Sequence, residues 1–402
     1  MVIIWLLALG YWRFKLNICI LTSSFPAHPD DIVQAPFLID FIEGLRRREH
    51  QVSVFTQDRN GAKKEFLEGV KVKWFPWMGS KKPLVHLNPL NPLDIVRTGS
   101  LFLLGQKTVI PFVKENKIDL CLALWVLPGG YFANYVYRKA GIPYSVWALG
   151  SDIYRYGQNP FLYPLMKRIV QEARGIFADG FDLTRRIEQR FGRKCDFLAT
   201  TRKFNPALDK PNEPNEPSEP GNPYHFLFVG RLEKVKGIDL LLRATALLKE
   251  ENLNFHLTVV GTGEMDEWAK SFSKQEGIED RVAFTGILSD ISLASLYQSS
   301  DCVVIPSRSE SIPLVFSEAL NFGKELVVTD VGDMGALGRQ YEAAEVVPPE
   351  NLIALKEALE KKILSRKNPR KEGKIGELLK LFDIETSVDR FLADYKERVR
   401  EW

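Results

Sequence analysis

Cysteine is scarce in this chain. Four cysteines occur among 402 residues, at Cys19, Cys121, Cys195 and Cys302, and they are far apart in the sequence. At least three of them lie in apolar, strand-like runs, which is typical of reduced thiols in a protein core. The spacing argues against a disulfide framework and against a cysteine-based zinc site, and it fits a cytosolic protein.

Excess charge of one sign and the common phosphate-binding motifs are missing too. The net charge is +3 and the positive residues are spread along the chain, which gives no electrostatic case for nucleic acid as a partner. Neither a G-x-x-x-x-G-K-[ST] loop nor a G-x-G-x-x-G turn occurs, so the usual nucleoside-triphosphate and dinucleotide fingerprints are absent. Among the five histidines, His50, His225 and His256 lie at or in predicted strands, where packing or capping is expected. Only His28 lies in a loop predicted to face a ligand.

The chain starts with an apolar run, "MVIIWLLALGYWRFK", that is too short for a membrane span. A spanning helix needs about 20 apolar residues, and this run also lacks a basic n-region and leads almost directly into a predicted strand. We interpret residues 1–15 as a ragged N-terminal extension. A shallow membrane anchor is the alternative.

The first half of the chain alternates between strands and helices. A length of 402 residues with 45% hydrophobic content predicts two domains. The run begins "LNICILT", "APFLIDFIEGLRRREH", "QVSVFT", and in its helix Phe37, Leu38, Phe41, Ile42 and Leu45 recur at helical spacing. Residues 16–207 are therefore predicted to form an α/β domain with a doubly wound parallel sheet.

The second half repeats this architecture after a break. The segment "ALDKPNEPNEPSEPGNP" offers nothing to bury, so residues 208–223 are predicted to be an exposed linker. Strand and helix patterns then alternate again over 224–383, and 384–402 form an amphipathic helix that caps the second domain or returns to the first. Two Rossmann-like domains of this kind face a central cleft, where ligands of open α/β sheets bind.

The stretch "FLFVGRLEKVKGIDLLLRA" has the features of a diphosphate site. A predicted strand ends at Gly230, a helix begins near Gly237, and the loop between them holds Arg231 and Lys236. Backbone N–H groups at a helix entrance and two cations in the loop are what a diphosphate needs. The alternative is that both residues are solvated loop cations.

A second glycine pair lies at the next strand end. In "VVGTGEMDEW", Gly261 and Gly263 occupy the point where a strand meets a helix, which allows the backbone to approach a ligand closely. A tight turn with ordinary capping explains this segment equally well.

The stretch "PSRSESIPLVFSEALNFG" places two carboxylates around a helix entrance. Pro313 is tolerated in a first helical turn, so the helix is predicted to run from about Ile312 to Asn321, with Gly323 closing it. Glu310 then precedes the helix and Glu318 lies inside it, with free N–H groups between them. The N–H groups could bind an anionic group of a ligand, and the two carboxylates could bind hydroxyls on either side of it. A nucleotide sugar offers this arrangement, with its diphosphate between the ribose and sugar hydroxyls. The alternative is that both glutamates are surface residues of the helix.

Taken in order, "VGRLEKVKG", "GTGE" and "VAFTGILSDISLASLYQSSDCVVIPSRSESIPLVFSEALNFGKELVVTDVGD" resemble the donor domain of glycosyltransferase family 4, the group 1 enzymes of the GT-B fold. The likeness is close over about 224–335. It is looser in the first half, in "LTSSFPAHPDDIVQAPFLIDFIEGLRRREHQVSVFT" and "GIPYSVWALGSDIYRY".

The resemblance implies a sugar transferase and a role for each matching residue. Arg231 and Lys236 would bind the donor diphosphate and stabilise the leaving group, and Glu310 would lie by the donor sugar. The other candidate donor-binding residues are Gly230, Gly263, Ile287 beside the base, Ile312, Pro313 and Leu314 through their backbone, and Glu318 at the ribose. Such enzymes mostly retain anomeric configuration and generally need no metal or other cofactor, in agreement with the lack of a D-x-D motif in this half.

The sequence departs from the family pattern at four places. The loop "SSFPAHPDDIVQ" has no glycine, and Leu149 stands where histidine usually precedes Gly-Ser/Thr-Asp. The helix entrance reads Glu-Ser-Ile-Pro instead of Glu-Gly-Phe-Gly, and Asp333 replaces the second glycine of a later Gly-Gly pair. These departures bear on the acceptor and on catalysis more than on nucleotide binding.

The acceptor side carries weaker signals. His28, Asp30, Asp31 and Asp152 are candidates for orienting an acceptor hydroxyl, which would belong to a glycan, a lipid-linked molecule or a small molecule in cell-surface polysaccharide or glycolipid synthesis. The segment 74–107 mixes aromatic, apolar and lysine residues that could contact the inner face of a membrane; a loop followed by a buried helix is the alternative. Two other functions remain open: a nucleotide-sugar epimerase on the same fold, and a catalytically silent sugar-nucleotide or glycan-binding protein.

Overall fold

The computed structural model describes residues 15–28, 34–59, 67–79, 84, 87–88, 90–156, 159–204, 222–365 and 372–399. Residues 1–14 of the predicted extension, residues 208–221 of the predicted linker, and the candidates Asp30 and Asp31 lie outside the described residues.

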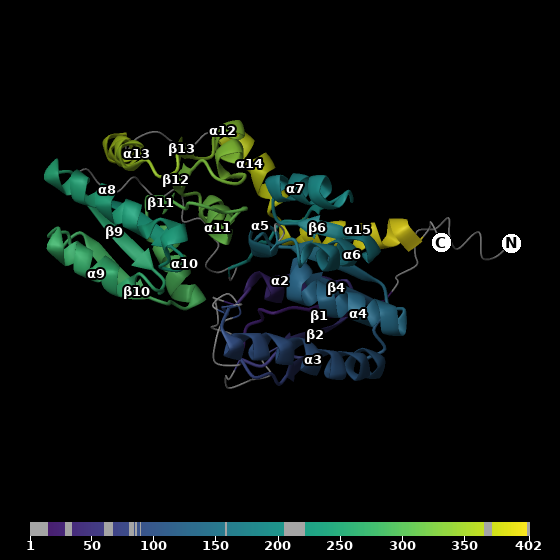
Figure 1. The fold of residues 1–402 in the computed structure, drawn as a ribbon. Coiled ribbons are helices and arrows are strands. Elements are labelled where there is room, and N and C mark those ends of the chain that lie inside the picture. Colours follow the sequence, from purple (N-terminus) through teal and green to yellow (C-terminus); the bar gives the residue numbers. More distant parts are fainter. Residues whose placement is uncertain are drawn as a thin grey trace. The chain divides into compact units, whose positions relative to one another are not determined.

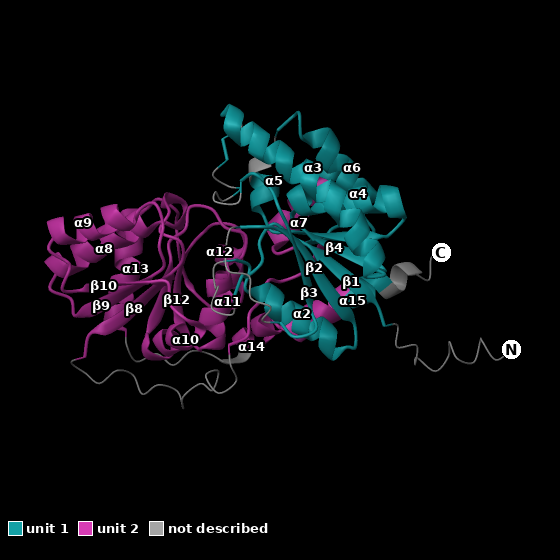
Figure 2. Ribbon diagram, turned by 90° about the horizontal axis from the view of Figure 1, so that it is seen from below, with its two compact units in different colours: residues 1–177, 191–195, 392–402 teal, residues 178–190, 196–391 magenta. Residues whose placement is uncertain are grey.

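The chain divides into two compact units (Figure 2). Unit 1 comprises residues 1–177, 191–195 and 392–402, and unit 2 comprises residues 178–190 and 196–391. Two stretches that precede the predicted linker, 178–190 and 196–204, therefore group with the second unit. The C-terminal helix is shared, because its first residues belong to unit 2 and its last to unit 1.

A seven-stranded sheet with strand order β3-β2-β1-β4-β5-β6-β7 is built mainly from the first half (Figure 1). Its strands are β1 (Asn17–Leu21), β2 (Gln51–Gln57), β3 (Lys71–Phe75), β4 (Leu120–Leu124), β5 (Tyr144–Ala148), β6 (Ile176–Ala178) and β7 (Asp196–Phe197). The pairs β1–β2, β1–β4, β2–β3 and β4–β5 are parallel. The connecting helices are α2 (Phe37–Arg47), α3 (Pro92–Glu115), the π-turn η2 (Trp125–Gly129), α4 (Gly130–Ala140), α5 (Ser151–Tyr156), α6 (Tyr163–Glu172) and α7 (Phe181–Phe191).

A six-stranded sheet with strand order β10-β9-β8-β11-β12-β13 forms the core of unit 2. Its strands are β8 (Tyr224–Val229), β9 (Phe255–Val260), β10 (Val282–Gly286), β11 (Cys302–Ile305), β12 (Glu325–Thr329) and β13 (Glu345–Val347), paired in parallel throughout. The helices are η3 (Lys234–Lys236, a 3-10 turn), α8 (Ile238–Glu250), α9 (Asp266–Gln275), α10 (Asp290–Ser299), α11 (Leu314–Asn321), α12 (Met334–Gln340), α13 (Leu352–Leu364), α14 (Glu372–Leu381) and α15 (Ile384–Val399). The predicted pair of doubly wound parallel-sheet domains is confirmed.

The cores follow the sequence pattern. Every apolar residue predicted for the inner face of α2 is buried, and all four cysteines are buried free thiols, as expected. On α15, Val388, Phe391 and Leu392 are buried, and the guanidinium of Arg174 lies 4.7 Å from the ring centroid of Tyr395. None of the helices that the described residues form combines the length and apolar content needed to cross a membrane.

The helix α11 begins later than predicted. It starts at Leu314, and Pro313 is its N-cap residue with extended backbone (φ −72°, ψ 148°), so the prediction of a start near Ile312 was wrong. Proline satisfies the N-cap position because it fixes φ and has no N–H to leave unpaired, while Ser311 and Ile312 stay in the loop. The predicted end is correct, since the helix stops at Asn321 and Gly323 has the left-handed φ of +65°.

Candidate functional site

The order of the second sheet reverses between its two central strands. β8 pairs with β9 on one side and with β11 on the other, so the loops after β8 and β11 emerge side by side at the carboxyl edge. In open α/β sheets this switch point is where ligands bind. The first loop carries Lys236 and the second carries Glu310.

Lys236 and Glu310 meet at this switch point. The Lys236 ammonium forms an ion pair with Oε1 of Glu310, and the hydroxyl of Ser307 donates to the same oxygen at 2.9 Å. Both side chains are largely buried, with 21% and 12% of their surface exposed. Two residues separated by 74 positions are therefore brought together as a partly desolvated ion pair. An anion bound here would interact more strongly with the Lys236 ammonium than it would in water.

The two loops approach each other through their backbones. Gly237 has a φ of +75°, and a Cβ at this position would lie 2.0 Å from the carbonyl oxygen of Pro306. Only glycine fits such a contact without displacing one of the loops. The turn that carries Lys236 is thus packed directly on the start of the loop that carries Glu310.

Arg231 is placed differently from Lys236. Its side chain is 51% exposed and pairs with Glu233 at 2.5 Å, in the same loop. A second cation is therefore available after β8, beside Gly230. Within the described part of the chain, the side chain of Arg231 pairs with Glu233 and not with Glu310, so its predicted part in diphosphate binding stays a prediction.

The glycines after β9 hold two loops together. A Cβ on Gly261, whose φ is +130°, would lie 1.9 Å from the carbonyl oxygen of Gly230, and one on Gly263 would lie 2.4 Å from that of Leu232. The N–H of Leu232 donates to Thr262 and the N–H of Met265 donates to Leu232. Close backbone packing therefore accounts for both glycines, and a contact of Gly263 with a donor remains a prediction.

Glu318 lies in a second network on α11. Its carboxylate accepts a hydrogen bond from the Tyr297 hydroxyl at 2.6 Å and pairs with Nε of Arg202 at 3.1 Å. Arg202 also pairs with Asp290 at 3.2 Å and stacks on Phe204, 4.4 Å from its ring centroid. Burial is the main cause that raises the pKa of Tyr297, which keeps its hydroxyl protonated as a donor.

The Gly332–Asp333 turn supports the same loop from another side. A Cβ on Gly332 would lie 2.2 Å from the carbonyl oxygen of Glu310, and Asp333 is buried. Both carboxylate oxygens of Asp333 accept from the N–H of Asp182, at 3.0 Å, at the start of α7. The aspartate that departs from the family pattern thus ties α7 to the site loop, and its burial raises its pKa.

The remaining donor-side candidates lie at the entrance of α11 or, for Ile287, directly after the edge strand β10. Ile312 is buried, Pro313 and Leu314 are half-buried at the helix start, and Ile287 is 53% exposed directly after β10. An exposed apolar side chain at the carboxyl edge of a sheet is available to pack against a planar ligand. The structure does not test these roles.

Two of the acceptor-side candidates, His28 and Asp152, lie among the described residues of unit 1. His28 is exposed. Asp152 is buried at the start of α5 and accepts a hydrogen bond from the N–H of Val126 at 2.5 Å. Desolvation raises the pKa of Asp152 to about 6, and backbone N–H groups oppose this rise.

Asp152→Asn is expected to stabilise the protein at neutral pH. The pKa of Asp152 in the folded state is about 6, above the ordinary value of 3.8, so the folded state favours the protonated form. The contribution of this carboxyl group to stability is therefore fully present below about pH 4 and is lost as the pH rises through 6. Removing the charge should raise the free energy of unfolding at pH 8 by up to about 3 kcal/mol, and by about 1 kcal/mol less at pH 5. Denaturant titration at both pH values measures this; equal gains at both would show that the carboxyl group is not the cause.

Several residues of the site were missed by sequence reasoning. Arg202, Tyr297 and Arg308 carry side-chain contacts to the site or to its loops, and none stood out in the sequence. Arg308 lies within the motif "PSRSES", where an arginine next to a phosphate-site loop was the available signal. Arg202 and Tyr297 gave no signal, because each acquires its role only through burial against Glu318.

Two family models match the sequence. The model described as glycosyl transferases group 1 matches residues 209–378, and the model described as glycosyl transferase 4-like matches residues 32–179. Both halves of the chain therefore match family models of glycosyltransferases. The group 1 match covers every strand of the second sheet and includes the switch point with Lys236 and Glu310. The 4-like match covers β2 to β6 of the first sheet.

Curated relatives match parts of the chain. An uncharacterised glycosyltransferase of Methanocaldococcus jannaschii is 39% identical over 108 residues, which is 27% of this chain and 27% of the relative. The chain spans about a quarter to a third of the length of the curated relatives it matches.

The fold extends over nearly the whole chain. Sucrose-phosphate synthase from Thermosynechococcus elongatus superposes with a TM-score of 0.74 at 16% identity, covering 96% of this chain and 100% of that one. Anabaena HepE in complex with UDP-glucose superposes with a TM-score of 0.72 at 18% identity, covering 95% and 100%. At such identities the likeness shows the fold, and the predicted GT-B architecture is confirmed.

Proposed function

We propose that this glycosyltransferase moves a sugar from a nucleotide-diphosphate sugar, bound in unit 2, to an acceptor hydroxyl. The observation that carries the proposal is the Lys236–Glu310 pair at the switch point of the second sheet. A cation for the diphosphate and a carboxylate for sugar hydroxyls stand together there, just before the entrance of α11. The UDP-glucose complex of HepE, a protein of the same fold, supports this donor class.

Each candidate residue has a part in donor binding. The diphosphate is held by Lys236, Arg231 and the free N–H groups around the start of α11, where the helix dipole favours an anion. Glu310 accepts from the sugar hydroxyls. Glu318 accepts from the ribose hydroxyls, with Arg202 and Tyr297 orienting its carboxylate, and Ile287 packs against the base.

In the chemical step, one bond of the anomeric carbon breaks and another forms. The bond between the anomeric carbon and the diphosphate oxygen breaks, and its electrons stay with the diphosphate. The acceptor oxygen bonds to the anomeric carbon, and the proton of the acceptor hydroxyl passes to the departing diphosphate. Lys236 and Arg231 stabilise the charge that develops on the leaving diphosphate, so we propose that the reaction needs no metal. Anomeric configuration is retained when the acceptor attacks on the face that the diphosphate leaves.

The acceptor is proposed to be a glycan, a lipid-linked molecule or a small molecule of cell-surface polysaccharide or glycolipid synthesis. In unit 1, α3 and the turns before it expose large apolar side chains. The set is Met78, Leu90, Leu93, Ile95, Val96 and Leu103. Such a surface fits peripheral contact with a membrane that holds a lipid-linked acceptor.

Membrane contact predicts co-flotation with anionic lipid vesicles. The double variant Leu93→Asp/Val96→Asp should lose most of this binding, because it places two charges on the exposed face of α3. Leu364→Asp is the matched control, since Leu364 is 69% exposed in unit 2 against 65% for Leu93. Equal flotation of all three proteins would remove α3 as the contact surface.

The donor site is tested by thermal shift against UDP-, GDP-, ADP- and TDP-sugars. One nucleotide class should raise the melting temperature, since a ligand at 100 times its Kd stabilises by about 2.7 kcal/mol. Glu318→Ala and Lys236→Ala should abolish the shift, and the responding class names the base. A shift that survives in both variants would place the donor elsewhere, and no shift with any compound would contradict the proposed function.

A further inference from the structure

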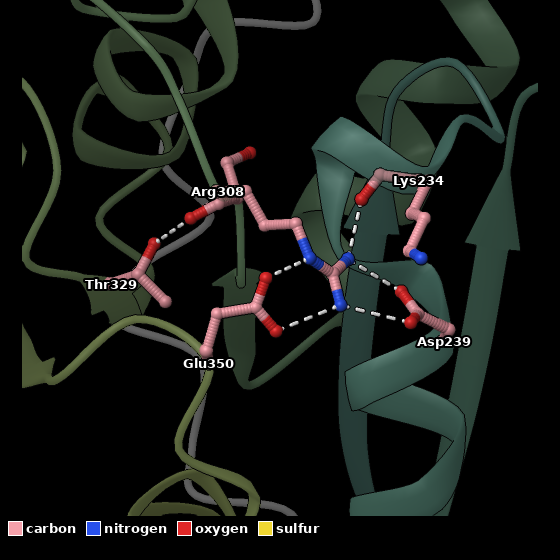
Figure 3. A network of polar contacts seen from close by, with 6 residues as sticks. Lys234, Asp239, Arg308, Thr329 and Glu350 are labelled. Carbon is pink, nitrogen blue, oxygen red and sulfur yellow. Dashed lines mark hydrogen bonds and ion pairs between the residues drawn. The ribbon is translucent and has the colours of Figure 1, made fainter.

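Arg308 forms a network between the two loops that carry Lys236 and Glu310. All five N–H groups of its guanidinium donate within the protein (Figure 3): to both oxygens of Asp239, to both oxygens of Glu350 and to the carbonyl of Lys234. The two bonds to Asp239 measure 2.6 and 2.9 Å, and the bond from Nη2 to Glu350 measures 3.1 Å. The side chain is only 16% exposed. No donor of this guanidinium is left for a ligand.

The main chain around Arg308 makes the same connection. Its N–H donates to the carbonyl of Val235 at 2.7 Å, and the hydroxyl of Thr329 on β12 donates to the carbonyl of Ser307 at 2.5 Å. The turn over 234–236 and the loop over 306–310 are therefore joined by backbone and side-chain bonds of one residue. Through Glu350, Arg308 also contacts the residues just before α13, and through Asp239 it contacts the first turn of α8.

These bonds help to fix the position of Lys236, because the turn that carries it has no buried residue and few internal hydrogen bonds. η3 has three residues, none of them buried, and Lys234 and Val235 are exposed. A short 3-10 turn has weak internal hydrogen bonds, so external contacts must hold its geometry. Arg308 bonds to the carbonyls of the two residues that precede Lys236, and it stands two residues before Glu310.

We infer that Arg308 is a positioning residue that fixes Lys236 and Glu310 relative to each other. The inference rests on the proposed function for its catalytic consequence, since Lys236 and Glu310 are there the donor-binding pair. Arg308 itself does not touch the donor. Its loss should therefore lower kcat more than it raises KM, because misplaced charges stabilise the leaving diphosphate less than they bind the ground state.

Arg308→Ala is expected to lower kcat at least tenfold and to change the donor KM less than threefold. Arg308→Lys keeps the charge but makes at most three hydrogen bonds, so it should recover only part of the loss. In the Lys236→Ala background, Arg308→Ala should lower kcat by a clearly smaller factor than in the wild type, since one of the two side chains that it positions is gone. A general loss of stability would instead reduce activity by the same factor in both backgrounds, and that result would overturn the inference.

Lys356 provides a matched control at the other end of α8. It pairs with Glu251 at 2.5 Å and Glu360 at 2.8 Å, and its side chain is 14% exposed. Glu251 lies about 18 Å along the helix from Asp239. Lys356→Ala removes two ion pairs of similar burial, and it should leave kcat within twofold of wild type. A loss of kcat equal to that of Arg308→Ala would contradict the inference.

Amide hydrogen exchange without any ligand separates this inference from the proposed function. Arg308→Ala should speed exchange in peptides over 233–238 and 306–311, whereas Lys356→Ala should not. Unchanged exchange in these peptides would overturn the inference whatever the activity. Faster exchange together with no transfer by the wild-type protein would instead mean that the proposed function fails while the positioning contact stands.

Discussion

Lys236→Ala is expected to lower the rate of sugar transfer at least tenfold, with the protein still folded. The ammonium is the largely buried cation at the switch point, and a charge held in a partly desolvated place stabilises a leaving diphosphate far more than an exposed one. A tenfold loss corresponds to about 1.4 kcal/mol of transition-state stabilisation. The fold should persist, because Glu310 keeps its hydrogen bond from Ser307.

Steady-state kinetics of Lys236→Ala, Lys236→Arg and Lys234→Ala test this expectation. Lys234 belongs to the same turn, and its exposed side chain carries the same charge, so Lys234→Ala controls for the loss of one positive charge. Its backbone carbonyl, which Arg308 uses, is unaffected by the substitution. Lys236→Arg should recover part of the rate. Equal activity of wild type and Lys236→Ala would remove this residue from the site.

The second large effect concerns stability. Arg202→Ala should lower the free energy of unfolding of unit 2 by about 3 kcal/mol, because it leaves the carboxylate of Glu318 without its cation. Both side chains of the pair are about 5% exposed, so little water reaches the carboxylate to replace the lost partner. Nucleotide binding should weaken as well, since Arg202 no longer orients the carboxylate of Glu318.

Denaturant unfolding of three variants measures the effect. Arg339→Ala is the control, because Arg339 and Asp330 form a pair with both side chains more than 40% exposed, and its loss should cost less than about 1 kcal/mol. The double variant Arg202→Met/Glu318→Leu should recover much of the stability lost in Arg202→Ala, since it removes both charges. If Arg202→Ala cost no more than Arg339→Ala, the buried pair would not be a source of stability.

Strands and helices were largely predictable from the sequence. Runs such as "YHFLFVG" and "NFHLTVVG" are apolar over strand length and end in glycine, and they became β8 and β9. The order of the strands was not predicted, because right-handed connections restrict the topologies without fixing where the order reverses. The start of α11 was placed two residues early, because proline is common both as a first helical residue and immediately before it.

The contacts of the site were less predictable than its residues. Lys236 and Glu310 were both identified from their loops, but their ion pair depends on β8 and β11 being neighbours. The partners of Glu318 come from Arg202 before the linker and Tyr297 on α10. No local pattern marks such residues, since burial and pairing are properties of the folded chain.

The most direct test of sugar transfer is nucleoside-diphosphate release from the donor identified by thermal shift, with and without a panel of glycan, lipid-linked and small-molecule acceptors. We predict release that requires an acceptor, yields a glycosylated product and is lost in Lys236→Ala. An altered sugar formed from the donor alone would identify an epimerase. Donor binding without release, for every acceptor in the panel, would contradict transfer and leave a sugar-nucleotide-binding protein.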